Sequence, residues 1–257
     1  MRPCATPHLT VRHAVFGGPK PLICVPLVAT TVDELLQQAA VAHALAPDVV
    51  EWRADAFNDL SPAAVIDAAG QLRNVLTSEA LIFTLRISTE GGVKPLPQDQ
   101  RREVIDAVVR SGDADIIDLE LSNGADFVAP LVTLAHLQNV RVILSFHDFA
   151  KTPDNDTLTA AVAEMVRQGA DIAKVACTPV DATDVLRMLD VTLAARRAFP
   201  ATPLCTLSMG RLGVLTRVAG FLFGSDMSFA VGQAASAPGQ IPVAEMRTMI
   251  DALIARS

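Results

Sequence analysis

Short runs of β-branched and apolar residues alternate along the chain with longer segments whose apolar residues recur every three to four positions. The short runs are typical of buried strands, and the longer spacing is typical of helices that pack one face against a core. This alternation predicts strands over residues 22–28, 48–53, 81–87, 115–121, 140–146, 172–177, 204–208 and 227–232. It predicts helices that begin at residues 31 and 61, and further helices over 98–110, 127–137, 157–168, 181–198, 215–219 and 243–255. Two apolar pieces at 9–11 and 14–16 precede a Gly-Gly-Pro break and predict a small hairpin.

Two of the predicted helices begin with recognisable capping signals. Thr31 is followed three residues later by Glu34, which is the spacing of a capping box. Ser61 is followed by Pro62, and proline is well tolerated in the first turn of a helix. We therefore expect Thr31 and Ser61 to cap the helices that follow them.

Eight strand–helix units in a chain of 257 residues favour a (β/α)₈ TIM barrel. We expect one domain over residues 1–257, with residues 1–20 as an N-terminal extension or β-hairpin. The competing architecture is a doubly wound open sheet, which usually carries a glycine-rich turn after its first strand. Here that position reads Val28-Ala29-Thr30-Thr31 and holds no glycine. The nearly continuous apolar strands suit a parallel sheet buried on both faces in either architecture.

The composition narrows the class of protein. Hydrophobic residues make up 51% of the chain and charged residues 19%, which excludes a disordered protein. The formal net charge is −7 and no basic stripe is visible, so we expect neither nucleic acid nor an anionic membrane as a partner. Charged residues interrupt every apolar run before it reaches membrane-spanning length. The first twenty residues lack the basic-then-apolar order of a secretory signal, and we expect a soluble, cytoplasmic protein.

The sequence gives no sign of a metal centre. The four cysteines (Cys4, Cys24, Cys177 and Cys205) are scattered and form no C-x-x-C pair, so a disulfide framework or a structural zinc site is disfavoured. No H-x-H or H-E-x-x-H spacing is present, which argues against a metal-dependent hydrolase. We therefore expect no bound metal.

Polar residues gather at the carboxyl ends of the predicted strands. In a barrel these ends converge on one mouth, which is where active sites of this fold lie. Glu51 and Arg53 are two positions apart and so point to the same side of their strand. The residues that share this placement are Glu51, Arg53, Arg86, Asp118, Glu120, His147 and Lys174. Each of them alone could be an interior ion pair or a solvated charge, but five strands with the same feature favour a functional site.

Lys174 is the most specific of these residues, because it stands between Ala173 and Val175 inside a strand. Burial and nearby arginines disfavour the charged form of a lysine, and a neutral amine attacks carbonyl compounds to form Schiff bases. The alternative is a buried lysine paired with Asp118 or Glu120, and the strand alone does not decide between the two.

His147 is the natural acid–base partner of Lys174, because an unperturbed imidazole titrates near neutral pH. The strands that carry the two residues are consecutive, so the side chains are expected to be neighbours in a barrel. The alternative is a histidine satisfied by backbone groups. The other four histidines lie in the N-terminal segment or on predicted helices and suggest no function.

Two late segments have the character of binding loops. The first, Ser208-Met209-Gly210-Arg211-Leu212-Gly213, leads to Arg217, a side chain suited to clamp a carboxylate with two hydrogen bonds. The second, residues 234–240, is rich in small residues with one proline and one glycine, which suggests a mobile lid. An ordinary helix start and a plain connection are the simpler explanations of these two segments.

Taken together, these segments resemble the type I 3-dehydroquinate dehydratases. The resemblance extends from Pro21 to Ala255, and the joint order of its motifs makes a chance match improbable. The motifs are Glu51-Trp52-Arg53-Ala54-Asp55, Arg86 with Glu90-Gly91-Gly92, Ser145-Phe146-His147-Asp148-Phe149, Ala173-Lys174-Val175-Ala176, Ser208-Met209-Gly210 with Arg217, Phe223-Gly224-Ser225 and Ser236-Ala237-Pro238-Gly239-Gln240.

The resemblance implies a mechanism on 3-dehydroquinate that needs no metal or organic cofactor. Lys174 would form an imine with the C3 ketone, His147 would act as general acid and base, and Glu90 would orient His147. The residues implied to bind substrate are Glu51, Arg53, Arg86, Met209, Arg217, Ser236 and Gln240, with Arg217 on the carboxylate and Ser236 and Gln240 in a closing lid. The family also implies a homodimer.

The chain departs from the family pattern at three positions. Pro26 stands where many relatives have a serine that touches substrate, which puts that contact in doubt. Thr216 stands in place of a common serine, and Phe146 in place of a common tyrosine. None of these changes removes a group with an implied catalytic role.

Two other functions fit parts of the pattern. A class I aldolase of a sugar phosphate would also use a lysine on the sixth strand, but such enzymes usually bind phosphate through backbone amides near strands seven and eight. A sensor that binds quinate-like ligands without turnover could dispense with Lys174 and His147, and both are present. A purely structural barrel gives no reason for the polar strand ends.

Overall fold

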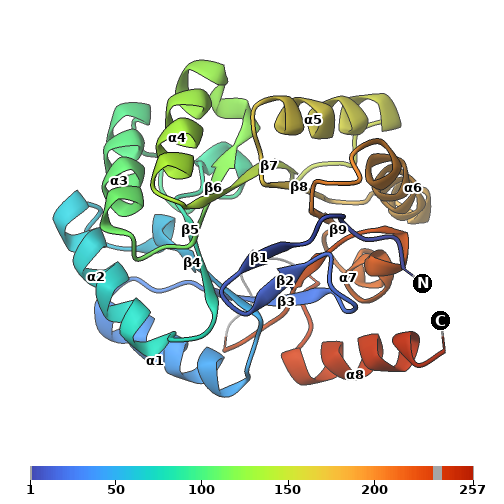
Figure 1. The fold of residues 1–257 in the computed structure, drawn as a ribbon, viewed down its shortest axis with the longest axis horizontal. Coiled ribbons are helices and arrows are strands. Elements are labelled where there is room, and N and C mark those ends of the chain that lie inside the picture. Colours follow the sequence, from blue (N-terminus) through green and yellow to red (C-terminus); the bar gives the residue numbers. More distant parts are fainter. Residues whose placement is uncertain (1, 234–238, 257) are drawn as a thin grey trace.

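The computed structural model describes residues 2–233 and 239–256, and its centre is a barrel of parallel strands (Figure 1). The strands run in the order β10-β3-β4-β5-β6-β7-β8-β9, and each pair in that series is parallel. β9 and β10 approach each other where the Asp226 amide donates to the Leu204 carbonyl at 2.6 Å. The bounds of the strands are β3 Leu22–Leu27, β4 Val49–Arg53, β5 Ala80–Thr84, β6 Ile116–Glu120, β7 Arg141–Asp148, β8 Ile172–Cys177, β9 Leu204–Ser208 and β10 Met227–Phe229.

Helices surround the barrel and follow its strands in turn (Figure 1). The predicted TIM barrel is therefore confirmed, and the open doubly wound sheet is excluded. The helices are α1 Val32–Ala44, α2 Pro62–Val75, α3 Gln98–Ser111, α4 Ala125–Leu137, α5 Asn155–Arg167, α6 Ala182–Ala198, α7 Val214–Ala219 and α8 Val243–Ile254. Short 3₁₀ helices, which the pattern does not predict, occur at η1 Ala54–Ala56, η2 Ser88–Glu90, η3 Leu121–Asn123 and η4 Gly220–Phe223.

The predicted hairpin is confirmed as β1 (Leu9–Val11) and β2 (Ala14–Phe16), an antiparallel pair that lies across one end of the barrel (Figure 1). Phe16 is fully buried in the cluster that also holds Leu22 and Val49, the first residues of β3 and β4. The hairpin therefore closes the end of the barrel where the strands begin. The end where they finish is left for the polar residues.

Alternation along each strand separates two apolar layers. On β6, Ile117 and Leu119 pack outward in the core shared with the helices. Ile116 belongs to the inner cluster on the other face, and Asp118 and Glu120 share that face. The inner positions thus change from apolar to polar along the strand, which places buried charge at its carboxyl end.

The capping prediction at Thr31 is correct in one of its two parts. The Thr31 hydroxyl accepts a hydrogen bond from the Glu34 amide at 3.3 Å, but the Glu34 carboxylate accepts from the Thr30 amide rather than that of Thr31. The reciprocal bond of a capping box is therefore shifted by one residue. Ser61 caps α2 as predicted, with its hydroxyl accepting from the Ala64 amide at 3.4 Å and Pro62 in the first turn.

Three strand ends differ from the prediction by two or more residues, and several other strand boundaries differ by one residue. β5 ends at Thr84 instead of residue 87, so Arg86 lies in the connection after the strand. β7 continues to Asp148 and includes His147, whereas β10 ends at Phe229 instead of residue 232. Apolar residues beyond a strand end look like strand in the sequence, and only pairing with the neighbouring strands limits them.

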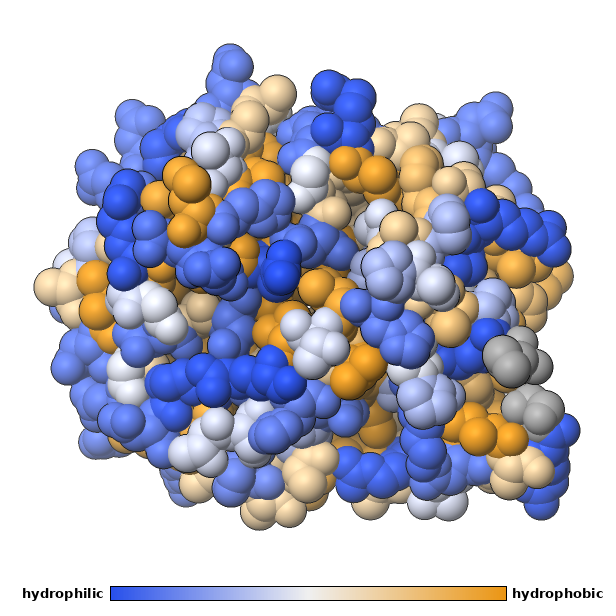
Figure 2. All heavy atoms as spheres, viewed as in Figure 1, coloured by the Kyte–Doolittle hydropathy of each residue, from blue (hydrophilic) through white to orange (hydrophobic). Residues whose placement is uncertain are grey.

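The surface is mixed in character. Figure 2 shows hydrophilic residues over most of this face, with hydrophobic residues between them in small areas. Among the described residues, no helix has both the length and the apolar character needed to cross a membrane.

Candidate active site

A pocket of about 470 Å³ lies at the carboxyl ends of the strands. Nine of the ten residues to which the family resemblance gives a catalytic or substrate-binding role line it, and the tenth, Ser236, lies outside the described residues. The nine are Glu51, Arg53, Arg86, Glu90, His147, Lys174, Met209, Arg217 and Gln240. The fold thus brings together side chains that are up to about 190 positions apart in the sequence.

Lys174 projects from β8 into this pocket and is only 4% exposed. Its Nζ donates to Asp118 Oδ2 at 2.8 Å and to Glu51 Oε1 at 3.4 Å. Nζ also lies 4.6 Å from the centre of the Phe229 ring, in the range of a cation–π contact. The amine is therefore held by charge on one side and by an aromatic face on another.

The charge state of Lys174 differs from the sequence-based expectation of a neutral amine. Burial alone would lower the pKa of Lys174, but the carboxylates of Asp118 and Glu51 outweigh it and raise the pKa above its ordinary value. In the unliganded protein the amine is therefore protonated. The other interpretation of the sequence, a buried lysine paired with Asp118, is therefore correct for the protein without substrate.

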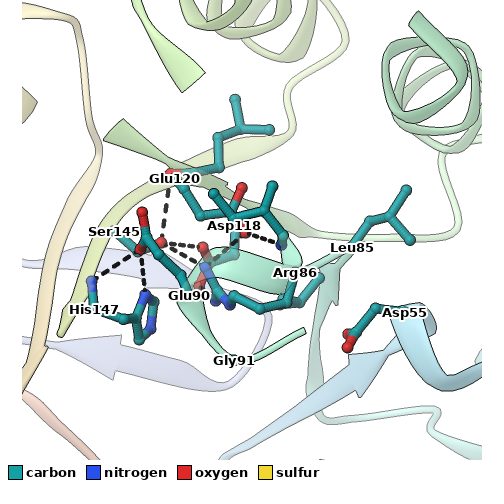
Figure 3. Close-up of polar contacts among 12 residues, drawn as sticks. Asp55, Leu85, Arg86, Glu90, Gly91, Asp118, Glu120, Ser145 and His147 are labelled. Atoms are coloured by element: carbon teal, nitrogen blue, oxygen red, sulfur yellow. Dashed lines mark hydrogen bonds and ion pairs between the residues drawn. The ribbon is translucent and has the colours of Figure 1, made fainter. Parts of the chain in front are cut away.

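Asp118, the partner of Lys174, is part of a buried charge network with Arg86, Glu120 and Ser145 (Figure 3). Arg86 donates to Asp118 Oδ2 and to the Ser145 hydroxyl, both at 2.8 Å, and to Glu120 Oε1 at 2.9 Å. Burial alone would raise the pKa of Asp118, but Arg86 and Lys174 together hold it far below its usual range. Asp118 therefore stays ionised beside the amine.

His147 and Glu90 form the second part of the site (Figure 3). Glu90 Oε2 accepts from the His147 backbone amide at 2.9 Å and lies 3.0 Å from His147 Nδ1. Because an ionised carboxylate only accepts hydrogen bonds, we assign the proton of the neutral imidazole to Nδ1, which leaves Nε2 as the basic nitrogen. Glu90 thus fixes both the orientation and the tautomer of the ring.

The electrostatics of the site keep His147 neutral. Burial lowers the pKa of His147 well below its ordinary value, and the positive charges of Arg86 and Lys174 lower it further. A base that remains unprotonated at neutral pH is what proton abstraction requires. The site therefore pairs one neutral imidazole with one protonated amine.

Two arginines border the pocket on other sides. Arg53 is held by Asp55 through Nε at 2.8 Å and Nη2 at 3.0 Å, and it also donates to the Gly91 carbonyl at 3.0 Å. Arg217 is buried on α7, and its Nη1 donates to the Phe229 carbonyl at 3.4 Å. Burial lowers the pKa of Arg217 to about 10, which still leaves it positively charged at neutral pH.

Sequence reasoning did not include several residues of the site. Asp118 was predicted to lie with the other polar residues of the strand ends and was named as an alternative partner of Lys174, but it was assigned no role in the reaction, although it is the nearest carboxylate to the amine. The lining residues that were missed are Phe149, Ala176, Leu207 and Phe229. Phe149 and Ala176 belong to the motifs around His147 and Lys174 that carry the family resemblance, and this is the signal that could have identified them.

The described residues contain no group of three or more histidine, cysteine, aspartate or glutamate side chains that could hold a metal ion. What the pocket offers instead is a lysine amine, a neutral imidazole and several fixed cations. This combination can take up a small anionic molecule, react with a carbonyl group and move a proton.

A TIM barrel with a buried lysine and an oriented histidine at the carboxyl ends of its strands has the architecture of an enzyme. The family model described as type I 3-dehydroquinase matches residues 23–256. A 3-dehydroquinate dehydratase of Aromatoleum aromaticum is 42% identical over 242 residues, which cover 93% of this chain and 92% of that protein. The chain belongs to the type I 3-dehydroquinase family and is thus a lyase.

Solved structures agree with this assignment. The 3-dehydroquinate dehydratase of Geobacillus kaustophilus HTA426 has a TM-score of 0.96 and 40% identity, with 100% of both chains covered. The type I enzyme of Clostridium difficile, solved with covalently modified comenic acid, has a TM-score of 0.93 and 31% identity, with 97% of this chain and 98% of that chain covered.

Proposed function

We propose that this protein converts 3-dehydroquinate to 3-dehydroshikimate in the shikimate pathway through an imine formed on Lys174. The observation that carries the proposal is the position of the Lys174 amine in the same pocket as the neutral His147. The covalently modified ligand of the Clostridium difficile relative supports a covalent route in this family.

Lys174 is the nucleophile that the pocket favours. Cys205 lies directly beside it in the β8–β9 pairing, but burial raises the pKa of the Cys205 thiol to about 12. A thiol in that state is a poor nucleophile, because the thiolate is the reactive form. The amine must lose its proton before it attacks, and His147 is the neutral base in the pocket that can accept one.

The proposed reaction starts with transfer of a proton from the Lys174 ammonium to His147 and attack of the free amine on the C3 carbonyl carbon. His147 returns that proton to the carbinolamine hydroxyl, which leaves as water, so that a protonated imine forms and His147 is neutral again. His147 Nε2 then removes a proton from C2, and the electron pair moves into the imine to form an enamine. The enamine expels the C1 hydroxyl, which takes the proton from His147 and leaves as water. Hydrolysis of the imine releases the product with a C1–C2 double bond and restores the amine. The protonated imine is the electron sink, so the route requires no cofactor.

The remaining site residues would bind and orient the substrate. Arg217 is proposed to hold the carboxylate, because a guanidinium matches a carboxylate with two parallel hydrogen bonds. Met209 would contribute apolar contact, and Glu51, Arg53 and Arg86 would face the ring hydroxyls. Gln240 and Ser236 are proposed to close over the substrate. A pocket of about 470 Å³ is a suitable size for one small cyclic acid.

Variants of the two central residues test this function. Lys174→Ala should abolish detectable turnover of 3-dehydroquinate, measured as the ultraviolet absorbance of the conjugated product. His147→Ala should lower kcat by roughly a hundred- to ten-thousand-fold, because general acid–base catalysis contributes about that much. Lys20→Ala is a matched control, since Lys20 pairs with Asp251 on the surface. Full turnover by Lys174→Ala would exclude the imine route.

The family also suggests a cytoplasmic homodimer, which is part of the proposal. Light scattering coupled to size-exclusion chromatography would give the mass in solution. A monomer at all concentrations would refute the dimer without affecting the proposed chemistry.

A further inference from the structure

We propose that Ser122 is a positioning residue for the acid–base step, because its hydroxyl fixes the Glu90 carboxylate that orients His147. The inference rests on the proposed function in one respect, namely that His147 moves protons during turnover. Ser122 itself does not line the pocket and is not expected to touch the substrate.

The two oxygens of Glu90 are held from two different elements. Oε1 accepts a hydrogen bond from the Ser122 hydroxyl of η3. Oε2 accepts from the His147 amide of β7 at 2.9 Å and lies 3.0 Å from Nδ1 of the same residue. A carboxylate held at one oxygen alone could rotate about its terminal torsion, which is soft. The bond from Ser122 therefore keeps Oε2 aimed at the imidazole.

The turn that presents Ser122 is itself anchored. Asn123 Nδ2 donates to the Glu120 carbonyl at 2.9 Å and to Glu120 Oε2 at 2.8 Å. Asn123 Oδ1 accepts from Arg101 Nη1 of α3 at 2.7 Å. Because its neighbour is fixed to both β6 and α3, Ser122 has a defined position from which to hold Glu90.

The hydrogen bond from Ser122 also helps to keep the Glu90 carboxylate ionised. Burial raises the pKa of Glu90, and the nearby carboxylate of Glu120 raises it further. The hydrogen bond from Ser122, the positive charge of Arg86 and the amide of His147 oppose that rise. Loss of the Ser122 hydroxyl removes one of these opposing contributions, so Glu90 takes up a proton at higher pH. A protonated Glu90 no longer serves as a full acceptor for the Nδ1 proton of His147.

The first test compares the pH dependence of kcat in the wild type, Ser122→Ala and Ser122→Thr. Ser122→Ala should move the acidic limb of kcat to higher pH by roughly half a unit, with little change in KM, because one hydrogen bond is worth about that much. Ser122→Thr retains the hydroxyl and should restore the wild-type profile. Ser88→Ala is a matched control, since Ser88 is an exposed serine of the same short helix as Glu90 and makes no hydrogen bond with it.

The second test does not depend on turnover. The carboxyl carbon of Glu90 is titrated by ¹³C NMR in the ligand-free protein, with Glu90→Gln used to assign the signal. Ser122→Ala should raise the midpoint by a similar amount, and Ser88→Ala should leave it unchanged. An unchanged midpoint or an unchanged acidic limb in Ser122→Ala would overturn the proposal. A wild-type protein that does not act on 3-dehydroquinate would instead contradict the proposed function, and the NMR titration would still test the contact.

Discussion

Lys174 and His147 illustrate how single side chains acquire their state from partners far away in the sequence. The amine is protonated because Asp118 and Glu51 outweigh the effect of burial on its pKa. The imidazole is neutral because burial and the positive charges of Arg86 and Lys174 all act in the same direction. The reaction therefore has to begin with a proton leaving the lysine.

The low pKa of His147 predicts how activity depends on pH. A base with a lowered pKa keeps its unprotonated form as the pH falls, so kcat should persist below pH 6.5, the ordinary pKa of a histidine. Activity should be lost only when the coupled His147–Glu90 pair takes up a proton, and the apparent pKa belongs to the pair. A pH profile of kcat measures this limb. An acidic limb at or above pH 6.5 would contradict the account.

At the residue scale, the sequence predicted where Lys174 and His147 lie, but not the charge state of Lys174. Lys174 between small apolar neighbours and His147 at the end of the preceding strand were placed together correctly. The protonation of Lys174 was not predictable, because it depends on the distance of 2.8 Å to Asp118, a residue 56 positions away. That distance is set by the pairing of several strands and not by local pattern.

At the scale of elements, the short helix η2, which lies between β5 and α3, supplies Glu90 to the site. It follows Arg86, ends in Glu90 and turns back through Gly91, whose φ is 87°. A Cβ on Gly92 would lie 2.2 Å from the Arg86 carbonyl oxygen, closer than any non-bonded contact allows. The turn thus depends on glycine at this position.

The Gly92→Ala substitution should therefore affect both stability and activity. Displacing the backbone is expected to lower the free energy of unfolding by about 1–3 kcal/mol. It should also lower kcat, because the clash is with the backbone of Arg86, and Glu90 is only two residues before Gly92. Urea unfolding and steady-state kinetics measure the two effects. Gly70→Ala in α2 is the control, since its Cβ would be 3.8 Å from Asp113 and alanine favours a helix.

The two substitutions separate a local clash from a general effect of alanine. Gly70→Ala should leave kcat unchanged and should not lower the free energy of unfolding. A Gly92→Ala variant that is as stable and active as the wild type would contradict the expected clash with the Arg86 carbonyl.

The 3₁₀ turns were not predictable from the sequence, because such short helices have no period of their own.

At the scale of the whole molecule, a buried ion cluster ties the N-terminal segment to the barrel. The fully buried Asp226 accepts from Arg2 Nη2 at 3.1 Å and from the Leu204 amide at 3.0 Å, and it also pairs with Arg196 of α6. These contacts lie where β9 and β10 begin, at the end of the barrel opposite to the pocket. Their role is therefore structural.

Asp226→Asn would leave Arg2 and Arg196 without their carboxylate partner. Removing one member of a buried ion pair costs about 3–5 kcal/mol of stability. Urea unfolding should show a loss of that size, whereas the folded protein should retain its kcat. Asp251→Asn on the surface is the control, because an exposed pair contributes less than about 1 kcal/mol. Equal effects of the two substitutions would contradict the assigned role of Asp226.

The barrel itself was predictable because eight strand–helix units repeat with consistent pattern. The strands β8 and β9 have the predicted bounds: Asp171 and Thr178 flank β8, and Pro203 directly precedes β9. The ends of β5 and β10 were placed too late, because apolar residues continue beyond the paired positions. Closure of the sheet depends on strand order, which no local segment encodes.

Reductive trapping tests the central claim, an imine on Lys174, most directly. The protein would be incubated with 3-dehydroquinate and treated with borohydride, which reduces an imine to a stable amine. Mass spectrometry of the peptides should then locate a single adduct on Lys174. An adduct on another residue, or none in a folded protein that binds and turns over the substrate, would contradict the account.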